Sequence, residues 1–355
     1  MKVSLVTRTA GLAAVAAIGL AACGSSSSGG NGGNSGSSTS LSPQGSTFQQ
    51  ALEQQWASDY HAAHPSAQIT YTGTGSSAGI EQFTAGKVAF AGSDVTMTAD
   101  EKSQADAACG SPSLTLPITA GGVAIIYNLP INNLKLDATT LAGIFMGKIT
   151  KWNDPAIAKD NPGVKLPTTA ISTFHRADGS GTTGVLSGFL DATAKSVWTL
   201  GSDKELTWPS GQGAQGSSGV TQGVKNTPGG ITYAEVTYAQ QAKLPTARVK
   251  GATGTFQPIS AATVSKSIAT GFALTGTEPD LAGALSFTKM TGYPISTVSY
   301  VLVCSKYADA GEGQLVKDYL TYAAGPGQAT GPGLGFAQLP KALANKVLAS
   351  IGTIS

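Results

Sequence analysis

Short turns rich in glycine, serine and threonine stand directly before three expected helices of this chain. They are residues 46–47, 73–79 and 179–184, and the latter two follow runs that look like strands. Residues 114–127 are rich in β-branched side chains and are expected to form another strand, interrupted at Gly121-Gly122. This alternation of strands and helices indicates an α/β fold with mixed or mostly parallel sheets.

The same turns have a chemical meaning. The start of a helix leaves backbone N–H groups without partners inside the helix, and the helix dipole adds positive potential there. Three such turns together describe an anion-binding site that needs no excess of basic residues.

Capping patterns predict where two of the helices begin. The first should open at Thr47, whose hydroxyl can accept from the backbone of Gln50 while the Gln50 side chain reaches back. The dipeptide His64-Pro65 should end that helix. Thr98 and Glu101 have the same spacing and predict another helix start.

The N-terminal residues have the pattern of a bacterial lipoprotein signal. Lys2 and Arg8 precede an apolar run that ends in Leu20-Ala-Ala-Cys23, which resembles a lipobox. The run is shorter than the ~20 residues of a membrane span. Residues 1–22 are therefore expected to be a signal peptide, with Cys23 lipidated and residues 23–42 a flexible tether at a membrane surface. An ordinary secretory signal is the alternative.

Charge argues against one class of partner. The signal holds two of the 22 basic residues, and the remainder balance the 20 acidic residues. Charged residues make up only 12% of the chain and form no basic block, so no nucleic-acid partner is expected.

Two cysteines remain beyond the signal, Cys109 and Cys304. Disulfides persist outside the cytoplasm, so the two can pair there. Two buried, unreactive thiols are the alternative.

Residues 175–184, HRADGSGTTG, contain the Gly-x-Gly-x-x-Gly spacing of a dinucleotide-binding turn. Arg176 and Asp178 crowd the start of that turn, however, and no βαβ unit with a ribose-binding acid follows. A P-loop is excluded because the chain lacks Gly-Lys-Ser/Thr. A nucleophilic Ser180 would need a base, and His175 cannot be assumed to face it. We therefore expect no catalysis, no cofactor and no metal.

The same stretch suits an oxyanion. Arg176 can present a bidentate fork to a tetrahedral anion. Ser180, Gly181 and Thr182 add hydroxyl and N–H donors at a helix start. A structural pair of Arg176 with Asp178 in a capped turn is the alternative.

This stretch and four others resemble the PstS family, the phosphate-binding receptors of high-affinity phosphate ABC transporters. The others are Gly45-Ser-Thr-Phe48, Gly75-Ser-Ser-Ala-Gly79, Gly92-Ser-Asp94 and residues 141–157. They occur in the family's order, and the resemblance covers residues 43–355. It implies a type II periplasmic-binding-protein fold, an α/β fold of two lobes. Each lobe would be a mixed sheet flanked by helices, and phosphate would lie in the cleft between them.

The resemblance also implies a set of residues that contact phosphate from the two lobes. These are Thr47, Phe48, Ser76, Asp94, Arg176, Ser180, Gly181 and Thr182. Thr47 and Ser76 would donate their hydroxyls and Phe48 its backbone N–H. Asp178 would orient the Arg176 guanidinium without touching the ligand.

Asp94 is expected to set the choice of anion. A carboxylate repels an anion unless the ligand has a proton to donate, which phosphate carries at neutral pH and sulfate lacks. A helix N-cap before Val95 is the alternative role for Asp94.

The chain departs from the family's usual pattern at two positions. Gln49 stands where proline is common, and Ala89 where aspartate is common. Neither is among the implied contacts. Tyr233 and Glu235 are interpreted as lobe structure and are left out of the site.

The lobes are expected to be discontinuous, with lobe 1 formed by residues 43–118 and 295–355 and lobe 2 by residues 119–294. The chain would cross between them near residues 117–119 and 294–296, which form the hinge. Cys109 and Cys304 then share lobe 1, as a disulfide requires.

The implied function is the capture of inorganic phosphate outside the cytoplasm by a lipid-anchored protein. The phosphate would then pass to the permease and ATPase subunits of an ABC transporter. A receptor for another tetrahedral oxyanion is one alternative, and a secreted phosphohydrolase is the alternative from a different class.

Overall fold

The computed structural model describes residues 39–355. The expected signal peptide, Cys23 and the tether as far as residue 38 lie outside the described residues. Strand β1, Ser40–Leu41, pairs in parallel with β3, Gln68–Ile69. The expectation of a tether up to residue 42 was therefore wrong at its end, because Leu41 is apolar and lies buried in the core.

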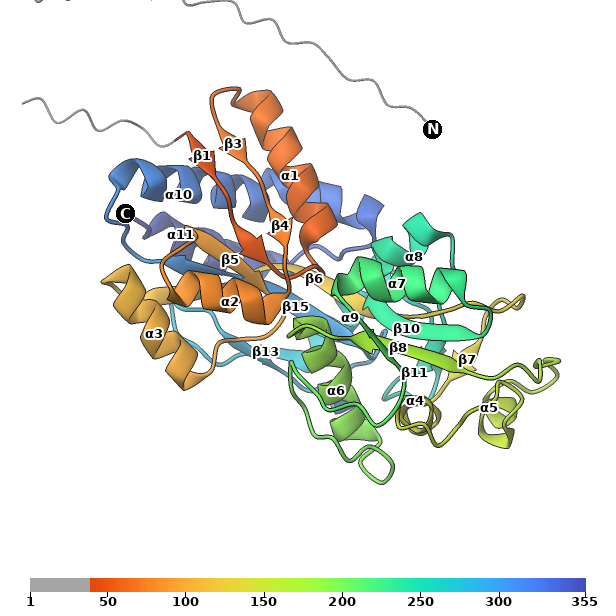
Figure 1. The fold of residues 1–355 in the computed structure, drawn as a ribbon. Coiled ribbons are helices and arrows are strands. Elements are labelled where there is room, and N and C mark those ends of the chain that lie inside the picture. The colour runs from red at the N-terminus through yellow and green to blue at the C-terminus, as the bar shows by residue number, and fades with distance from the viewer. Residues whose placement is uncertain (1–38) are drawn as a thin grey trace, which may run out of the picture. The chain divides into compact units, whose positions relative to one another are not determined.

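A mixed eight-stranded sheet organises the fold, in the order β4-β2-β5-β15-β6-β10-β8-β9. Strands β2, β4 and β5 run parallel, β15 runs antiparallel to both β5 and β6, and β8 runs parallel to β9 and β10. Their bounds are Gln44–Gly45 (β2), Thr72–Gly73 (β4), Phe90–Ser93 (β5), Ser113–Tyr127 (β6), Ser172–Arg176 (β8), Gln212–Ala214 (β9), Gly230–Glu235 (β10) and Ser296–Cys304 (β15). Figure 1 shows β6 and β15 in the middle of this arrangement.

Strand β6 changes partner along its length. It pairs with β15 from Ser113 to Gly122 and with β10 from Val123 to Tyr127. The expected interruption at Gly121-Gly122 was wrong, since the strand runs through both glycines. The irregularity lies instead at Ile118 of β6. Ser299 of β15 pairs with Thr119 and Tyr300 pairs with Pro117, so Ile118 is an extra residue without a partner in β15.

Helices cover both ends of the sheet. Near β5 and β15 lie α1 (Gln50–Ala63), α2 (Ser76–Thr84), α3 (Ala99–Cys109), α10 (Ala310–Ala324) and α11 (Lys341–Gly352). Near β8 and β10 lie α4 (Ala138–Phe145), α5 (Pro155–Asp160), α6 (Gly181–Thr193), α7 (Gly216–Asn226) and α8 (Val236–Ala242). Helix α9 (Ala261–Gly271) contacts both β6 and β15.

Smaller elements complete the fold. They are β7 (Lys135–Leu136), β11 (Arg248–Lys250) and β12 (Phe256–Gln257) in one sheet, β13 (Phe272–Leu274) and β14 (Gly283–Leu285) in another, and the 3₁₀ helices η1 (Phe287–Lys289) and η2 (Pro326–Leu334). None of the helices among residues 39–355 is both long and apolar enough to cross a membrane.

The helix boundaries test the capping patterns. Helix α3 has the expected capping box of Thr98 and Glu101, and His64 is the C-cap of α1 as predicted. The capping box at Thr47 and Gln50 was wrong. Helix α1 begins at Gln50, and its N-cap residue Gln49 makes no capping side-chain bond. The Thr47 hydroxyl is engaged across the molecule instead, with Arg176 and Ser217.

Cys109 and Cys304 form a disulfide, with their Cα atoms 5.5 Å apart. It joins the end of α3 to the end of β15. The alternative of two free buried thiols is thereby excluded.

Candidate functional site

The glycine-rich turns meet at one place in the fold. The turn before α6 lies against the start of α2, where the Ser77 backbone N–H donates to the Gly179 carbonyl at 3.1 Å. The N-terminus of α6 also presses on the end of β5. A Cβ atom placed on Gly181 would lie 2.5 Å from Ser76 Oγ and 2.8 Å from Asp94 Cβ. The structure therefore brings Ser76, Asp94 and Gly181 into direct contact.

Asp94 follows β5 directly and is 2% exposed. Its Oδ1 accepts hydrogen bonds from Ser46 Oγ at 2.7 Å and Ser299 Oγ at 2.6 Å. Its Oδ2 accepts from Thr182 Oγ1 at the long distance of 3.4 Å. Burial raises the pKa of Asp94, and the hydrogen bonds from Ser299 and Ser46 oppose that rise. The N-cap alternative is excluded, because the next helix is α3 and its cap is Thr98.

Arg176 ends β8 and is 4% exposed. Its Nε donates to Asp178 Oδ1 at 2.7 Å, and its Nη2 pairs with Asp178 Oδ2. Asp178 also accepts from the Gly216 N–H at 3.0 Å. Burial alone would raise the pKa of Asp178, but the hydrogen bonds and charge of Arg176 outweigh it and lower that pKa. Asp178 thus fixes the direction of the guanidinium, a geometry that fits both the orienting role and the alternative of a structural pair.

The third nitrogen of the guanidinium points away from Asp178. Arg176 Nη1 donates to Thr47 Oγ1 at 3.0 Å and to Ser217 Oγ at 3.2 Å. The two hydroxyls are themselves 2.8 Å apart. Thr47 and Arg176 are far apart in sequence but belong to one group of hydrogen-bonded side chains. We call this group, together with Asp94 and its hydrogen-bond partners, the polar cluster.

The remaining predicted residues lie at helix starts. Ser180 is the N-cap of α6 and accepts from the Thr183 N–H at 3.2 Å, while its own N–H donates to the Lys204 carbonyl. Gly181 and Thr182 form the first turn of α6, where backbone N–H groups have no acceptor inside the helix. The Phe48 backbone N–H donates to Ser46 Oγ at 3.0 Å, and its side chain is fully buried. The N–H groups of Gly181 and Thr182 thus have the placement that the turn pattern expects of anion donors. Those of Ser180 and Phe48 already have acceptors within the protein.

The cluster lacks the pairing of a nucleophile with a base. His175 stacks on Trp208 with ring centroids 5.0 Å apart, and its Nδ1 lies 3.2 Å from the Arg176 carbonyl oxygen. Ser180 is used as a helix cap. Among residues 39–355, no three His, Cys, Asp or Glu side chains gather as metal ligands would.

Sequence reasoning missed three serines that the structure places in the cluster, Ser46, Ser217 and Ser299. Ser46 stands within the quoted motif Gly45-Ser-Thr-Phe48. Ser217 opens α7 after β9, in Gly216-Ser-Ser-Gly219, so the turn pattern that located the other donors could have located it. Ser299 lies inside β15, where no local pattern distinguishes it.

Tyr233 adjoins the cluster although the sequence interpretation left it out. Its hydroxyl accepts from the Arg176 backbone N–H at 3.2 Å and lies 2.6 Å from Thr183 Oγ1. Burial raises the pKa of Tyr233 to about 12. Tyr233 therefore supports the backbone of two site segments as a neutral phenol.

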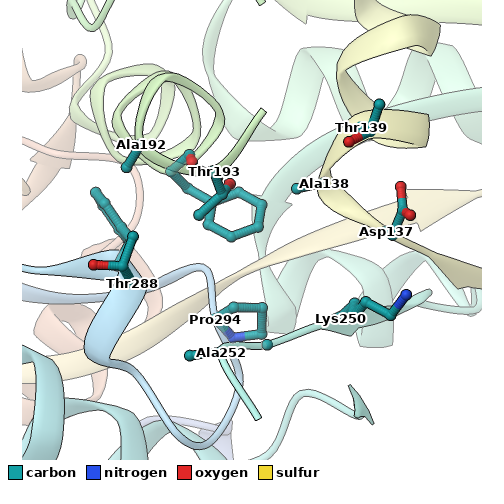
Figure 2. Close-up of a pocket in the computed structure, with 12 residues that line it drawn as sticks. Asp137, Ala138, Thr139, Ala192, Thr193, Lys250, Ala252, Thr288 and Pro294 are labelled. Atoms are coloured by element: carbon teal, nitrogen blue, oxygen red, sulfur yellow. Dashed lines mark hydrogen bonds between the residues drawn. The ribbon is translucent and has the colours of Figure 1, made fainter. Parts of the chain in front are cut away.

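The described part of the chain has several surface hollows, and one of them adjoins the polar cluster. One of about 430 Å³ opens beside the cluster, with His175, Arg176 and Asp178 in its wall. Another, of about 420 Å³, contains none of the predicted site residues and includes Asp137 and Lys250 (Figure 2). Asp137 already caps α4 by accepting from the Thr140 N–H, so its carboxylate is engaged.

The comparison with known proteins agrees with the geometry. Residues 31–326 match the model of the PBP superfamily domain. Phosphate-binding protein PstS 3 of Mycobacterium tuberculosis (strain ATCC 25618 / H37Rv) is 36% identical over 322 residues, which is 89% of this chain and 87% of that protein. Phosphate-binding protein PstS of Xylella fastidiosa is 33% identical over 318 residues, or 86% of this chain and 83% of that protein.

Solved structures share the fold. The phosphate-binding protein from Stenotrophomonas maltophilia has a TM-score of 0.69 at 21% identity, covering 88% of this chain and 94% of that one. A putative phosphate ABC transporter substrate-binding protein from Clostridium perfringens, with bound phosphate, has a TM-score of 0.61 at 18% identity and covers 85% of this chain and 100% of that one. At these identities the likeness concerns the two-lobed periplasmic-binding fold.

Proposed function

Because the chain belongs to the PBP superfamily and, within it, to the phosphate-binding PstS proteins, we propose that it captures inorganic phosphate outside the cytoplasm. It then delivers the phosphate to the permease and ATPase subunits of an ABC transporter. Capture is non-covalent, since neither His175 nor Ser180 belongs to a pair of nucleophile and base in the described part of the chain.

One observation carries this proposal. A buried carboxylate, Asp94, faces the N-terminus of α6 and lies in the same polar cluster as the buried guanidinium of Arg176. The guanidinium and the helix N–H groups attract an anion, whereas the carboxylate accepts it only if it brings a proton. Protonated phosphate meets both demands, and sulfate meets only the first.

The ligand contacts proposed are those of the eight residues named from the sequence, with Asp178 holding Arg176. Thr47, Ser76 and Asp94 come from segments before β6, and Arg176 with the start of α6 comes from segments after it. Ser217 is added as a neighbour of the Arg176 Nη1.

The lobe division is likewise a proposal, and the exchange of partners along β6 supports it. The strand pairs with β15 up to Gly122 and with β10 from Val123 onward. We therefore move the first proposed crossing from residues 117–119 to residues 121–123. The segment of residues 280–283 is assigned to lobe 1 as a refinement. Asp280 accepts from the Thr115 N–H at 2.8 Å, and the Tyr300 hydroxyl donates to the Gly283 carbonyl at 3.3 Å.

The lipid anchor at Cys23 completes the proposal and accounts for a location at the outer face of the membrane. Metabolic labelling with a fatty-acid analogue should mark the wild-type protein and leave a Cys23→Ser variant unlabelled. Release of the unmodified wild-type protein from the membrane would contradict the anchor while leaving phosphate binding untouched.

A calorimetric titration tests the binding function. The protein is first unfolded and dialysed to remove contaminating phosphate, then refolded and titrated with phosphate, arsenate and sulfate. Phosphate and arsenate should bind and sulfate should not, whereas Asp94→Asn, which can donate, should lose this preference. Equal sulfate binding by the wild-type protein would favour the general oxyanion receptor. Turnover of a phosphate monoester would favour the phosphohydrolase.

A further inference from the structure

We propose that Gln49 and Ser299 position the Asp94 carboxylate so that one of its oxygens remains available to a protonated ligand. They would thereby help to determine anion specificity without touching the ligand themselves. The inference rests on the proposed function, because it concerns how the phosphate site distinguishes anions.

The two oxygens of Asp94 have different surroundings. Oδ1 receives two short hydrogen bonds, from Ser46 Oγ at 2.7 Å and Ser299 Oγ at 2.6 Å. Oδ2 has only the 3.4 Å contact with Thr182 Oγ1. Two donors aimed at Oδ1 leave little room for a proton on that atom. Oδ2 is therefore the oxygen left to accept from a ligand.

Gln49 determines where the Ser299 proton goes. Gln49 Nε2 lies 2.6 Å from Ser299 Oγ and 2.7 Å from the Tyr300 carbonyl oxygen. A carbonyl oxygen only accepts, so the Gln49 atom facing it must be the nitrogen, with one N–H for each neighbour. Ser299 Oγ thus accepts from Gln49 and must donate its own proton elsewhere. Asp94 Oδ1, at 2.6 Å, is closer than the Ser93 carbonyl, at 3.3 Å.

This chain of donors is closed off from water. Gln49 and Ser299 are both 0% exposed, and they come from the N-cap of α1 and the middle of β15. Gln49 makes no capping bond to α1, so its side chain is committed to β15.

The chemical consequence concerns the proton on Asp94. Burial raises the pKa of this carboxyl, and the bond from Ser299 is foremost among the contacts that lower it. Without that bond Asp94 takes up a proton at a higher pH. A protonated Asp94 can donate to sulfate, so discrimination between the two anions is lost first at acid pH.

The test uses Ser299→Ala and Gln49→Met, which interrupt the same chain from different elements. Affinities for phosphate and sulfate are measured by calorimetry on phosphate-free protein between about pH 5 and 8. Ser299→Ala should lower the phosphate-to-sulfate affinity ratio about tenfold or more, the scale of a lost hydrogen bond to a charged group. Gln49→Met removes only the neutral bond that orients Ser299, so it should lower the ratio by about twofold to tenfold. The loss should grow as pH falls. Ser299→Thr keeps the hydroxyl and should rescue the ratio.

Several results would overturn the inference. An unchanged ratio and pH profile in a folded Ser299→Ala or Gln49→Met protein would do so, and so would equal weakening of both anions at every pH. If neither variant folds, a folded Ser299→Thr protein that has lost the wild-type preference for phosphate would also contradict it, because this variant keeps the hydroxyl that donates to Asp94. A wild-type protein that binds no phosphate would instead overturn the proposed function.

Discussion

The carboxyl groups buried in this protein differ in their partners, and those partners decide their charge. Asp178 has Arg176 beside it, which lowers its pKa. Glu53 has no cation. It is fully buried on α1, accepts from the Tyr319 hydroxyl at 2.7 Å and leaves Oε1 without a partner, and burial raises its pKa to about 7. Glu53 therefore links folding to pH, whereas the site carboxylate Asp178 stays charged.

The sign of that linkage follows from the two states. Folded, Glu53 keeps its proton to about pH 7, whereas the unfolded chain releases it near the ordinary value of 4.5. The contribution of Glu53 to the free energy of unfolding is therefore full below about pH 4.5, and it is lost as the pH rises toward 7. The loss amounts to at most about 3 kcal/mol.

We expect Glu53→Gln to flatten this dependence, because an amide has no proton to lose. Urea unfolding at about pH 5 and pH 8 measures the change in the free energy of unfolding for each protein. Burial also raises the pKa of Glu235, to about 8, but Glu235 adds the same pH dependence of stability to the wild-type protein and to the variant. The exposed Glu81→Gln on α2 serves as the control. If the free energy of unfolding of Glu53→Gln changes with pH as much as that of the wild-type protein, ionisation of Glu53 does not destabilise the folded state.

At the scale of elements, the turn before α6 can lie close to the start of α2 because Gly179 has no side chain. A Cβ on Gly179 would collide with Ser77 Oγ and with the Glu205 side chain. The atoms around this position belong to neighbouring protein segments, and Gly179 is not a proposed ligand contact. A substitution at Gly179 therefore tests how closely the two turns must approach without removing a ligand contact.

We expect Gly179→Ala to weaken phosphate binding by about fivefold to a hundredfold, the scale of an overpacked contact. The thermal midpoint without phosphate should change little, since the two turns can move apart. Gly352→Ala, where a Cβ meets nothing within 4 Å, is the matched control. If Gly179→Ala instead lowers the thermal midpoint and leaves phosphate affinity unchanged, the glycine is needed for folding and not for binding.

The disulfide acts between other elements. It closes a separation of 195 residues and lies at the ends of α3 and β15, and neither cysteine contacts the polar cluster. Cys109→Ala with Cys304→Ala should lower the free energy of unfolding by up to about 5 kcal/mol in the chain-entropy model. Phosphate affinity should persist in the folded variant. Chemical denaturation and calorimetry measure the two quantities, and a loss of affinity without a loss of stability would contradict this expectation.

For the whole molecule, one ion pair connects the two proposed lobes beside the site. Lys204 Nζ lies 2.5 Å from Glu101 Oε1, and both side chains are partly exposed. Glu101 belongs to α3 in lobe 1, whereas Lys204 follows α6 in lobe 2. The pair can therefore favour the closed arrangement in which the turns are in contact.

We expect Lys204→Met to reduce phosphate affinity about twofold to fivefold at low ionic strength, and less at high ionic strength, because salt screens exposed charges. Titrations at two salt concentrations measure this. Lys102→Met removes the pair with Asp106 inside α3, which joins no two lobes, and is the control. An effect of equal size in both variants would argue against a role in closure.

Local patterns in the sequence determined much of this protein. The strand-to-helix turns, the capping box at Thr98, the end of α1 at His64 and the pairing partners Cys109 and Cys304 are all visible in short segments or in cysteine count. The turn pattern indicated donors for an anion because helix starts expose N–H groups wherever they occur. The same pattern misled at Thr47, where a distant guanidinium competes for the hydroxyl that would otherwise cap the helix.

Tertiary structure alone decided which atoms face one another. Asp94, Ser46, Ser299 and Gln49 come from three separate parts of the chain, and only the order β2-β5-β15 in the sheet brings them together. A serine inside a strand carries no local signal of its partner, because its hydroxyl direction depends on the register of the neighbouring strand. The sequence thus predicted donors for an anion, whereas the pairing of strands decided that Asp94 Oδ1 receives two short hydrogen bonds and Oδ2 receives only a long one.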